Sequence, residues 1–349
     1  ADIIIKNMKV LSILIAAGLM TGVYFAMSGS SVDEVELAFG AYTTEFNKNY
    51  QSEEEYNFRK NIFEANLKTI NEHNAKGVSF TMGTNAFTDW TDEEYKRMLG
   101  YKSNRNTPQE FRNLGDLPTN CKNLPRKSID WRDEGIVTDV KNQGACGSCW
   151  AFAAVGSLEG AYAKTTGDLV SFSESQLVEC DKFSHGCSGG LMFNGFNHWM
   201  RNSPRTEKDY PYPKNAKPGK CSEDKIPSDY PLLEWGYRVD ITWECLYEAL
   251  THNVVSVAIR AENDPFRHYS GGIIDDDESH GIDCGTDLDH GVTLVGYDAD
   301  EDAWIVKNSW GAGWGENGFV RIRRGEGMGV CGINQENSQA VYDDSEYRK

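Results

Sequence analysis

The sequence places a cysteine at the start of a predicted helix, where its chemistry differs from that of an ordinary thiol. Cys149 lies in the run QGACGSCWAF, residues 143–152, and apolar residues at helical spacing follow it as far as Gly167. Unpaired N–H groups and the helix dipole at such a position favour a thiolate over a thiol. Because a thiolate beside a histidine is a strong nucleophile, the pattern predicts covalent catalysis by Cys149.

The pair Cys146-x-x-Cys149 is also compatible with a redox dithiol or with half of a zinc site. A redox dithiol is expected inside a βαβ unit, and a zinc site needs a second pair of ligands at matching spacing. The sequence around this pair offers neither. We therefore expect no metal and no cofactor.

A histidine and an asparagine far downstream lie in strings of similar character. His290 lies in DHGVTLVGY, and Asn308 lies in KNSWG, which is followed by GWGE. The other histidines are expected to be surface or packing residues. Together with the run around Cys149, these strings resemble the papain-like cysteine peptidases.

The resemblance implies a role for each residue of the site. Cys149, as a thiolate beside protonated His290, would attack a peptide carbonyl; His290 would then protonate the departing amine, and water would hydrolyse the acyl-enzyme. Asn308 would orient the imidazole, and Trp310 would cover that hydrogen bond. The side-chain amide of Gln143 and the backbone N–H of Cys149 would hold the oxyanion.

The region before these strings resembles the family's inhibitory propeptide. Residues 33–76 predict two amphipathic helices with a break near residues 49–52. Six residues spaced three or four apart share one helix face, and four more follow in the string GTNAFTD. The ten residues that match the two propeptide motifs are Glu55, Arg59, Phe63, Asn66, Ile70, Asn74, Gly83, Asn85, Phe87 and Asp89. The resemblance covers about residues 33–340 and implies a cathepsin L-like zymogen.

After the propeptide region, helices are predicted first and strands later, an order that indicates the α+β class. The strands are expected at residues 254–259, 291–297, 304–307 and 319–323. The resemblance implies a papain-like two-lobed fold, with a helical left lobe and a β-barrel-like right lobe, behind an N-terminal helical propeptide. We expect a signal peptide at 1–28, an inhibitory propeptide at 29–124 and the peptidase domain at 125–349.

Export is predicted from the start of the chain. Residues 10–27 are uncharged and apolar, and they follow Lys6 and Lys9, which is typical of a signal peptide. An uncleaved membrane anchor is the alternative. Nine cysteines also indicate disulfides and hence an oxidising compartment. We expect the secretory pathway, leading to an acidic lysosome- or vacuole-like compartment or to the extracellular space. The sequence has no N-glycosylation sequon that would support delivery through N-glycans.

The family resemblance also implies three disulfides, which are Cys146–Cys187, Cys180–Cys221 and Cys284–Cys331. Besides Cys149, two cysteines then remain. Cys245 lies in a predicted helix and is expected to be a buried free thiol. Cys121 lies at the junction of propeptide and peptidase domain, where it would be removed or would pair with an unidentified partner.

Substrate recognition is predicted at two places. Gly189 and Gly190 would offer backbone groups to an extended peptide. The side chains that match the family's main specificity pocket, S2, are Leu191, Met192, Ala258, Leu288 and Gly291, with Glu336 at the pocket floor. A carboxylate in an apolar pocket costs free energy until a cation arrives. We therefore expect S2 to accept Leu or Phe and also Arg; the alternative is that Glu336 turns into solvent.

Charge and composition limit the partners. A net charge of −18 disfavours nucleic acid. The expected partners are peptide or protein substrates, the chain's own propeptide and, by the resemblance, cystatin-type inhibitors; we expect a monomer. The acidic run at residues 275–278 is expected to be a solvated loop. No pair of histidines typical of a dipeptidyl relative lies beside Cys187 and Cys221, which favours endopeptidase action.

The charged propeptide region predicts activation by acid. Acid should discharge the propeptide's Asp and Glu residues, weaken its ion pairs and trigger its removal, with a cut near residues 121–125. The main rival is a catalytically silent binding or regulatory protein on the same scaffold, which the intact set of catalytic residues disfavours. A stand-alone inhibitor would lack the catalytic strings, and a transamidating enzyme would lack the propeptide motifs.

Overall fold

A computed structural model describes residues 31–102, 121, 124–228, 230, 234–239 and 242–341, with the backbone alone for 31–33 and 234–239. The expected signal peptide and most of the expected linker lie outside these residues. The chain divides into two compact units, residues 1–41 and 42–349. The described part of the first unit belongs to α2 (Ser31–Glu45). Within the described ranges, no helix is both long and apolar enough to span a membrane.

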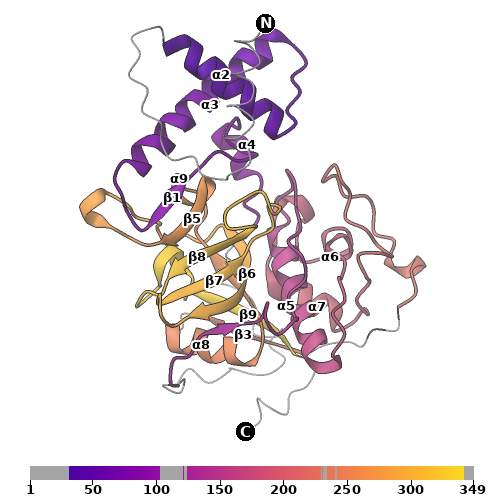
Figure 1. Ribbon diagram of the computed structural model, residues 1–349. Coiled ribbons are helices and arrows are strands. Elements are labelled where there is room, and N and C mark those ends of the chain that lie inside the picture. The colour runs from indigo at the N-terminus through magenta and orange to yellow at the C-terminus, as the bar shows by residue number, and fades with distance from the viewer. Residues whose placement is uncertain are drawn as a thin grey trace, which may run out of the picture. The chain divides into compact units, whose positions relative to one another are not determined.

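The second unit begins with residues 42–102, which we call the propeptide region, and we call its described residues from 124 to 341 the peptidase region. The long helix of the propeptide region, α3 (Glu53–Asn74), starts at the N-cap Ser52, whose hydroxyl accepts the N–H of Glu55 at 3.1 Å. A short helix, α4 (Asp92–Lys96), starts with a capping box between Thr91 and Glu94. Between the two helices, β1 (Phe80–Met82) pairs antiparallel with β5 (Tyr269–Ile274) (Figure 1). The propeptide region therefore adds a strand to the sheet of the peptidase region.

The helix that begins at Cys149 is α5 (Cys149–Thr166), as the sequence predicts. It ends at Gly167, whose φ of 82° is a left-handed conformation that glycine adopts without strain. Most of α5 is buried, because it packs against the sheet on one side and against α7 on another. The other helices are α6 (Glu174–Cys180), α7 (Met192–Trp199), α8 (Trp243–His252) and α9 (Asp264–Arg267), with short 3-10 turns at Gly186–Ser188, Glu223–Lys225, Glu278–His280 and Val330–Gly332.

The strands form a mixed sheet in the order β1-β5-β8-β7-β6-β4-β9-β3, with β2 paired to β6. Their bounds are β2 (Ile129–Asp130), β3 (Glu234–Val239), β4 (Val255–Ile259), β6 (His290–Asp298), β7 (Ala303–Lys307), β8 (Phe319–Arg323) and β9 (Glu336–Val341). All pairs are antiparallel except β5 with β8. Over the described strands the path is open, so the expected barrel-like lobe is a sheet that does not close. The α+β class is confirmed.

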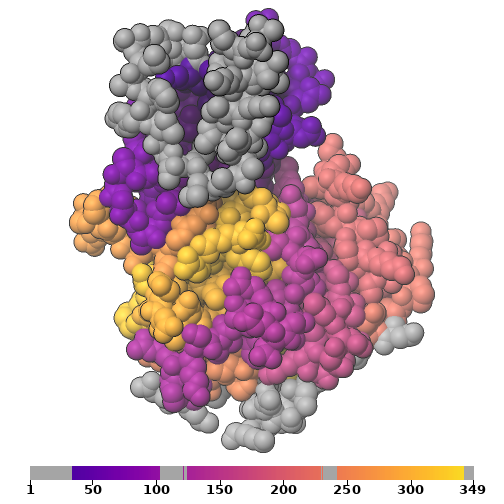
Figure 2. Space-filling model, viewed as in Figure 1, coloured from indigo at the N-terminus to yellow at the C-terminus, as the bar shows by residue number. Residues whose placement is uncertain are grey.

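Two large apolar cores hold the second unit together. The first lies on the sheet and α8, and it includes propeptide side chains such as Ile70, Phe80 and Tyr95. The second surrounds α5, α6 and α7. Figure 2 shows the orange-to-yellow surface, which belongs to the residues from α8 to β9, bordering the magenta-to-salmon surface, which belongs to the residues from β2 to the turn at Glu223–Lys225. The border between the two halves is where the catalytic strings meet.

Candidate active site

Cys149 is the first residue of α5 and is completely buried. Its sulfur accepts two backbone N–H groups, from Gly291 at 3.4 Å and from Gly100 at 3.2 Å. The first donor belongs to the peptidase region and the second to the propeptide region. Of the nine cysteines, all of which lie in described parts of the chain, Cys149 is the one free thiol.

His290 opens β6 directly before Gly291, so it is brought beside Cys149 by the strand itself. Its Nε2 lies 2.8 Å from Oδ1 of Asn308. The same oxygen accepts the N–H of Ser309, so it acts as the acceptor for both groups and Nε2 carries the ring proton. His290 Nδ1 is buried without a hydrogen-bond partner among the described residues. That nitrogen is therefore available to exchange a proton.

Trp310 lies against this pair, as expected. Its ring centroid is 4.8 Å from that of His290, and it is 3% exposed. The indole N–H donates to Oε1 of Gln143 at 3.2 Å. Trp310 thus excludes water from the imidazole and also fixes the neighbouring amide.

Gln143 is fully buried and held at both ends of its amide. Oε1 also accepts the Ser309 hydroxyl at 2.7 Å. Nε2 donates to the carbonyl of Cys146 at 2.8 Å and to that of Met98, in the propeptide region, at 2.9 Å. A propeptide carbonyl therefore takes the amide that would hold an oxyanion.

After Met98, residues 100–102 form an extended segment, which we call the propeptide strand and which is distinct from β1. It runs along the glycines that are expected to bind substrate. Gly190 donates its N–H to the carbonyl of Gly100 at 2.8 Å and accepts the N–H of Lys102 at 3.3 Å. The bridge between Tyr101 and Gly190 is parallel, and Tyr101 N–H donates to the carbonyl of Asp289 at 3.0 Å. A Cβ at Gly100 would lie 1.8 Å from the carbonyl oxygen of Gly147, so this position requires glycine.

Burial beneath this strand sets the protonation of the catalytic pair. Loss of hydration raises the pKa of the Cys149 thiol to about 11, although N–H groups of Gly291 and Gly100 oppose the shift. The same loss lowers the pKa of His290 to about 4. In this covered form thiol and imidazole are both neutral. The thiolate–imidazolium pair expected from the sequence stays a prediction for the uncovered enzyme.

The side chains expected to form S2 gather around one row of the sheet. Ala258 pairs with Gly291 across β4 and β6. The β4–β9 register, Ser256 with Ser338 and Val257 with Asn337, continues to Ala258 opposite Glu336. Glu336, Ala258 and Gly291 therefore share one face of three adjacent strands.

The apolar members of the expected pocket lie in the second core. Leu191, Met192 and Ala258 are buried there, and Leu288 packs against it partly exposed. Met192 Sδ is 3.2 Å from where a Cβ of Gly291 would lie. Glu336 is 7% exposed, so it does not turn into solvent, and burial raises its pKa to about 7.

The first propeptide motif holds α3 to the rest of the propeptide region. Arg59 forms an ion pair with Glu94. Asn66 and Asn74 donate to backbone carbonyls at 2.8 Å. Phe63 and Ile70 are buried. Glu55 instead accepts the N–H of Gln51, the residue before the N-cap Ser52, at the exposed start of α3.

The second propeptide motif joins the propeptide region to the peptidase region. Asp89, 3% exposed, accepts Tyr42 OH and Lys48 Nζ at 2.7 Å and Tyr50 OH at 2.8 Å. Asn85 donates to the carbonyl of Arg267 at 2.7 Å, and Gly83 N–H donates to that of His268 at 2.8 Å. Phe87 packs 5.4 Å, centroid to centroid, from Trp310.

The structure contains the three disulfides that the resemblance implies, Cys146–Cys187, Cys180–Cys221 and Cys284–Cys331. The expectation of a free thiol at Cys245 was wrong, whereas the alternative that Cys121 pairs with an unidentified partner is confirmed. Cys245 is buried but not free, because it is bonded to Cys121. Helix periodicity predicted the burial, whereas no local pattern in the sequence could identify a partner 124 residues away.

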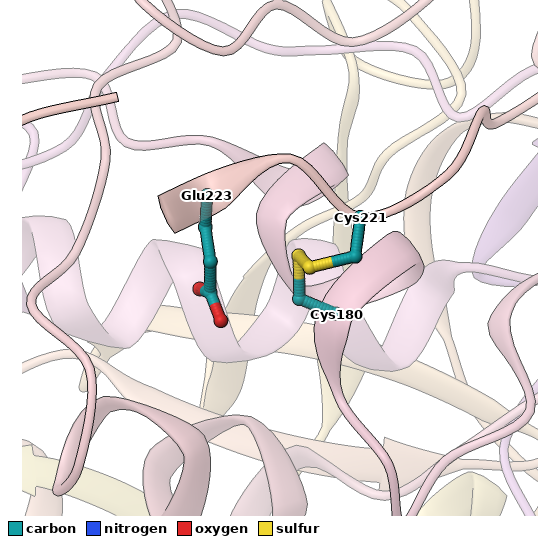
Figure 3. Close-up of side chains that lie close together, drawn as sticks. All are labelled: Cys180, Cys221 and Glu223. Carbon is teal, nitrogen blue, oxygen red and sulfur yellow. A yellow bond between two sulfur atoms is a disulfide. The ribbon is translucent and has the colours of Figure 1, made fainter. Parts of the chain in front are cut away.

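Among the residues that the structure describes, one group of side chains has the spacing of a metal site. Ligand atoms of Cys180, Cys221 and Glu223 lie within 4.8 Å of one another. Figure 3 shows the two sulfurs joined in a disulfide, with the Glu223 carboxylate beside them. That carboxylate bonds to His198 Nε2 and to Gln176 Nε2, each at 2.8 Å. Because the two sulfurs are bonded to each other, they are not thiolates that could bind a metal, and we interpret the group as structural.

The comparisons with known proteins agree with this geometry. Residues 125–341 match the model of the papain family cysteine protease, and residues 39–95 match the cathepsin propeptide inhibitor domain (I29). The chain is 41% identical over 313 residues to cysteine protease XCP2 of Arabidopsis thaliana, covering 87% of this chain and 86% of that protein. It is 38% identical over 311 residues to chymopapain of Carica papaya, with the same two shares.

Solved precursor structures are similar over nearly the whole chain. The proform of Amb a 11, a ragweed pollen cysteine protease, superposes with a TM-score of 0.75 at 32% identity and covers 92% of this chain and 100% of its own. A digestive procathepsin L2 from Tenebrio molitor gives a TM-score of 0.75 at 33% identity, covering 88% and 99%.

Proposed function

The chain belongs to the papain family of cysteine proteases, and on this premise we propose that it is a precursor that acid converts into an active endopeptidase. It is a papain-like cysteine peptidase with an inhibitory propeptide. The observation that carries the proposal is the covered nucleophile. Gly100 donates to the sulfur of Cys149, and Met98 takes the amide of Gln143. Both groups are ones that a substrate would need.

We further propose that the chain is organised as a signal peptide at 1–28, an inhibitory propeptide at about 29–124 and a peptidase domain at 125–349. The propeptide match at 39–95 and the peptidase match from 125 support this division. Secretory or vacuolar delivery, cystatin-type inhibitors and a monomeric enzyme follow as proposals from the same family membership.

The proposed reaction starts when the propeptide strand leaves the cleft. The Cys149 proton moves to Nδ1 of His290, and the thiolate sulfur bonds to the scissile carbonyl carbon. The oxyanion accepts hydrogen bonds from the side-chain amide of Gln143, which no longer donates to Met98, and from the backbone N–H of Cys149. Asn308 keeps the ring in the orientation that presents Nδ1.

The carbon–nitrogen bond then breaks, and the departing amine takes the proton from His290. In the second half, His290 accepts a proton from water, whose oxygen attacks the acyl-enzyme carbonyl. The carbon–sulfur bond then breaks with thiolate as the leaving group, the acid product leaves, and the thiolate of Cys149 and the imidazolium of His290 are restored. Trp310 covers one side of the imidazole of His290 and keeps bulk water from that side. The proton is therefore exchanged at the uncovered nitrogen, Nδ1.

For specificity, we propose that S2 accepts Leu, Phe and Arg because of Glu336. The row of Glu336, Ala258 and Gly291 supports the assignment, since it runs from the pocket floor to the residue beside Cys149. With a pKa of about 7, the carboxyl is neutral in acid and accepts an apolar side chain. Above that pH it is charged, and a guanidinium is the favourable occupant.

An epoxide affinity reagent tests the proposed nucleophile. After removal of the propeptide, the reagent should add one equivalent to Cys149 and abolish peptide hydrolysis in proportion. The covered precursor should react far more slowly. A processed enzyme that neither reacts nor cleaves peptides would contradict the proposal and would favour a binding role for the scaffold.

A further inference from the structure

A fourth disulfide joins the segment between the propeptide and peptidase matches to the peptidase domain. It connects Cys121, which precedes the peptidase match at residue 125, to Cys245 in α8. Cys245 is 1% exposed and belongs to the core of the sheet, and Cys121 packs against that core. The proposed boundary near residue 124 would assign Cys121 to the propeptide, although its sulfur is bonded into the peptidase domain.

The residues after Cys121 are fastened to the same helix. We call residues 121 and 124–131 the α8 strap. Lys127 donates its N–H to Tyr247 OH at 2.8 Å, and Trp131 Nε1 donates to the carbonyl of Leu250 at 2.9 Å. The strap then enters the sheet, because β2 pairs with β6.

Further contacts of the strap are apolar or cationic. Leu124 packs on the core of the sheet. The guanidinium of Arg126 lies 5.4 Å from the ring centroid of Trp243. The strap is therefore anchored as an integral part of the peptidase domain, by a covalent bond at its start and by several contacts along its length.

The propeptide strand in the cleft is held differently. Its contacts with Gly190 and Asp289 are backbone hydrogen bonds, which break when the strand dissociates. A cut after Cys121 would leave this inhibitor linked through the disulfide to the domain that it blocks. A tethered segment keeps an effective concentration on the order of millimolar, so inhibition would persist after such a cut. A cut before Cys121 releases the inhibitor completely.

We propose that activating proteolysis cuts the chain on the N-terminal side of Cys121, so that the α8 strap and the Cys121–Cys245 disulfide remain in the mature enzyme. The inference rests on the proposed zymogen function and moves the start of the mature chain ahead of residue 125. The step hydrolyses a peptide bond and leaves the disulfide unchanged, so no reductant takes part.

The first test locates the start of the mature chain without relying on the enzyme's own activity. The Cys149→Ala precursor is cleaved in acid by a trace of papain, treated with iodoacetamide, and analysed by N-terminal sequencing and by intact mass with and without reduction. We expect a mature chain that starts at or before Cys121, carries no alkylated cysteine and releases no propeptide fragment on reduction. A start at residue 122 or later, with a Cys121-bearing propeptide fragment released by reduction, would overturn the proposal.

A second experiment, in which the parent precursor is placed in acid without added papain, distinguishes failure of the proposed zymogen function from failure of the proposed cleavage position. If it stays inactive, the proposed function fails, while the boundary is still read from Cys149→Ala. If it activates, its own mature chain must also retain Cys121.

A stability measurement gives an independent result. Mature enzyme from the Cys121→Ser, Cys245→Ser double variant should unfold about 5–15 °C below the parent, because closing a long loop stabilises the folded state. Its kcat/KM at 25 °C should stay within about twofold, since neither cysteine touches the catalytic groups. Equal unfolding temperatures of the two mature enzymes would mean that the parent has lost the disulfide, and the proposal would be wrong.

Discussion

At the scale of single residues, inhibition depends on the absence of a side chain at Gly100. Its N–H reaches the sulfur of Cys149, and its carbonyl pairs with Gly190, because the backbone approaches the cleft more closely than any Cβ permits. The sequence gives no sign of this role, since Gly100 lies beyond both propeptide motifs and its contacts come from distant parts of the chain.

We predict that Gly100→Ala weakens inhibition by about 10–100-fold, because the added Cβ would overlap the Gly147 carbonyl and force the strand out of the cleft. The measurement is peptide hydrolysis by the uncleaved precursor at neutral pH. Gly40→Ala in α2 is the matched control, since a Cβ there meets nothing within 4 Å. If both uncleaved variants remain equally inactive in peptide hydrolysis, the close approach of the Gly100 backbone is not needed for inhibition.

A second residue-scale prediction concerns Glu336. The ratio of Arg to Phe cleavage at P2 should rise as pH increases through about 7, where the buried carboxyl ionises. Glu336→Gln should keep Phe cleavage within a few-fold and remove the pH-dependent gain for Arg. Paired fluorogenic peptides across pH 5 to 8 provide the measurement. Equal loss of both substrates in Glu336→Ala would refute the assignment of this residue to the pocket floor.

At the scale of elements, a buried ion network joins the segments that carry catalytic groups. Lys141, two residues before Gln143, donates to Glu159 of α5 at 2.8 Å and to Glu174 of α6 at 2.7 Å. Both carboxylates are almost fully buried, and burial raises the pKa of Glu174 while the charge of Lys141 opposes that shift. The network therefore holds Lys141, and with it the segment that carries Gln143, against α5.

Lys141→Met should destabilise the peptidase domain by about 3–5 kcal/mol, because it leaves two buried carboxylates without their cation. Thermal unfolding of the mature enzyme measures the loss. Adding Glu159→Gln and Glu174→Gln should recover part of it by removing the uncompensated charges. If the single variant unfolds like the parent, the network does not stabilise the domain.

Elements were predictable where one segment carries its own signal. α5, with its start at Cys149 and its glycine end, and the strands β4, β6, β7 and β8 follow from local periodicity. β9 was missed, because its sequence ENSQAV is polar yet entirely buried between neighbouring strands. The Cys121–Cys245 bond and the contact of Met98 with Gln143 could not be foreseen, since both depend on chain segments brought together only by folding.

At the scale of the whole molecule, acid promotes release of the propeptide only through groups that bind more protons in the released state than in the covered state. The catalytic pair does not, because a neutral thiol and imidazole bind the same number of protons as the thiolate–imidazolium pair. Two other histidines do respond. Burial lowers the pKa of His268 to about 3, and it also lowers the pKa of His73 in the propeptide region. Wherever release of the propeptide rehydrates one of these rings, the ring takes a proton in acid, and for that ring release is favoured as pH falls below about 6.5.

Glu94 acts at lower pH. Its ion pair with Arg59 depresses its pKa to about 2, so the stability that this pair supplies is present above about 4.5 and is lost as pH falls toward 2. We predict that the precursor with His73→Gln and His268→Gln activates at lower pH than the parent, and that Glu94→Gln activates at higher pH. Half-times of conversion across pH 3 to 7 measure the order. A pH profile that is unchanged in both variants would contradict this account of the trigger.

The most direct test of the central claim compares the parent precursor with Cys149→Ala. Both are acidified while intact mass and hydrolysis of a Phe-Arg fluorogenic peptide are followed together. We predict that the parent shortens by about the mass of its propeptide and becomes active, whereas the variant does neither. A parent that remains inactive after another protease has removed its propeptide would contradict the claim that Cys149, His290 and Asn308 form a working catalytic site.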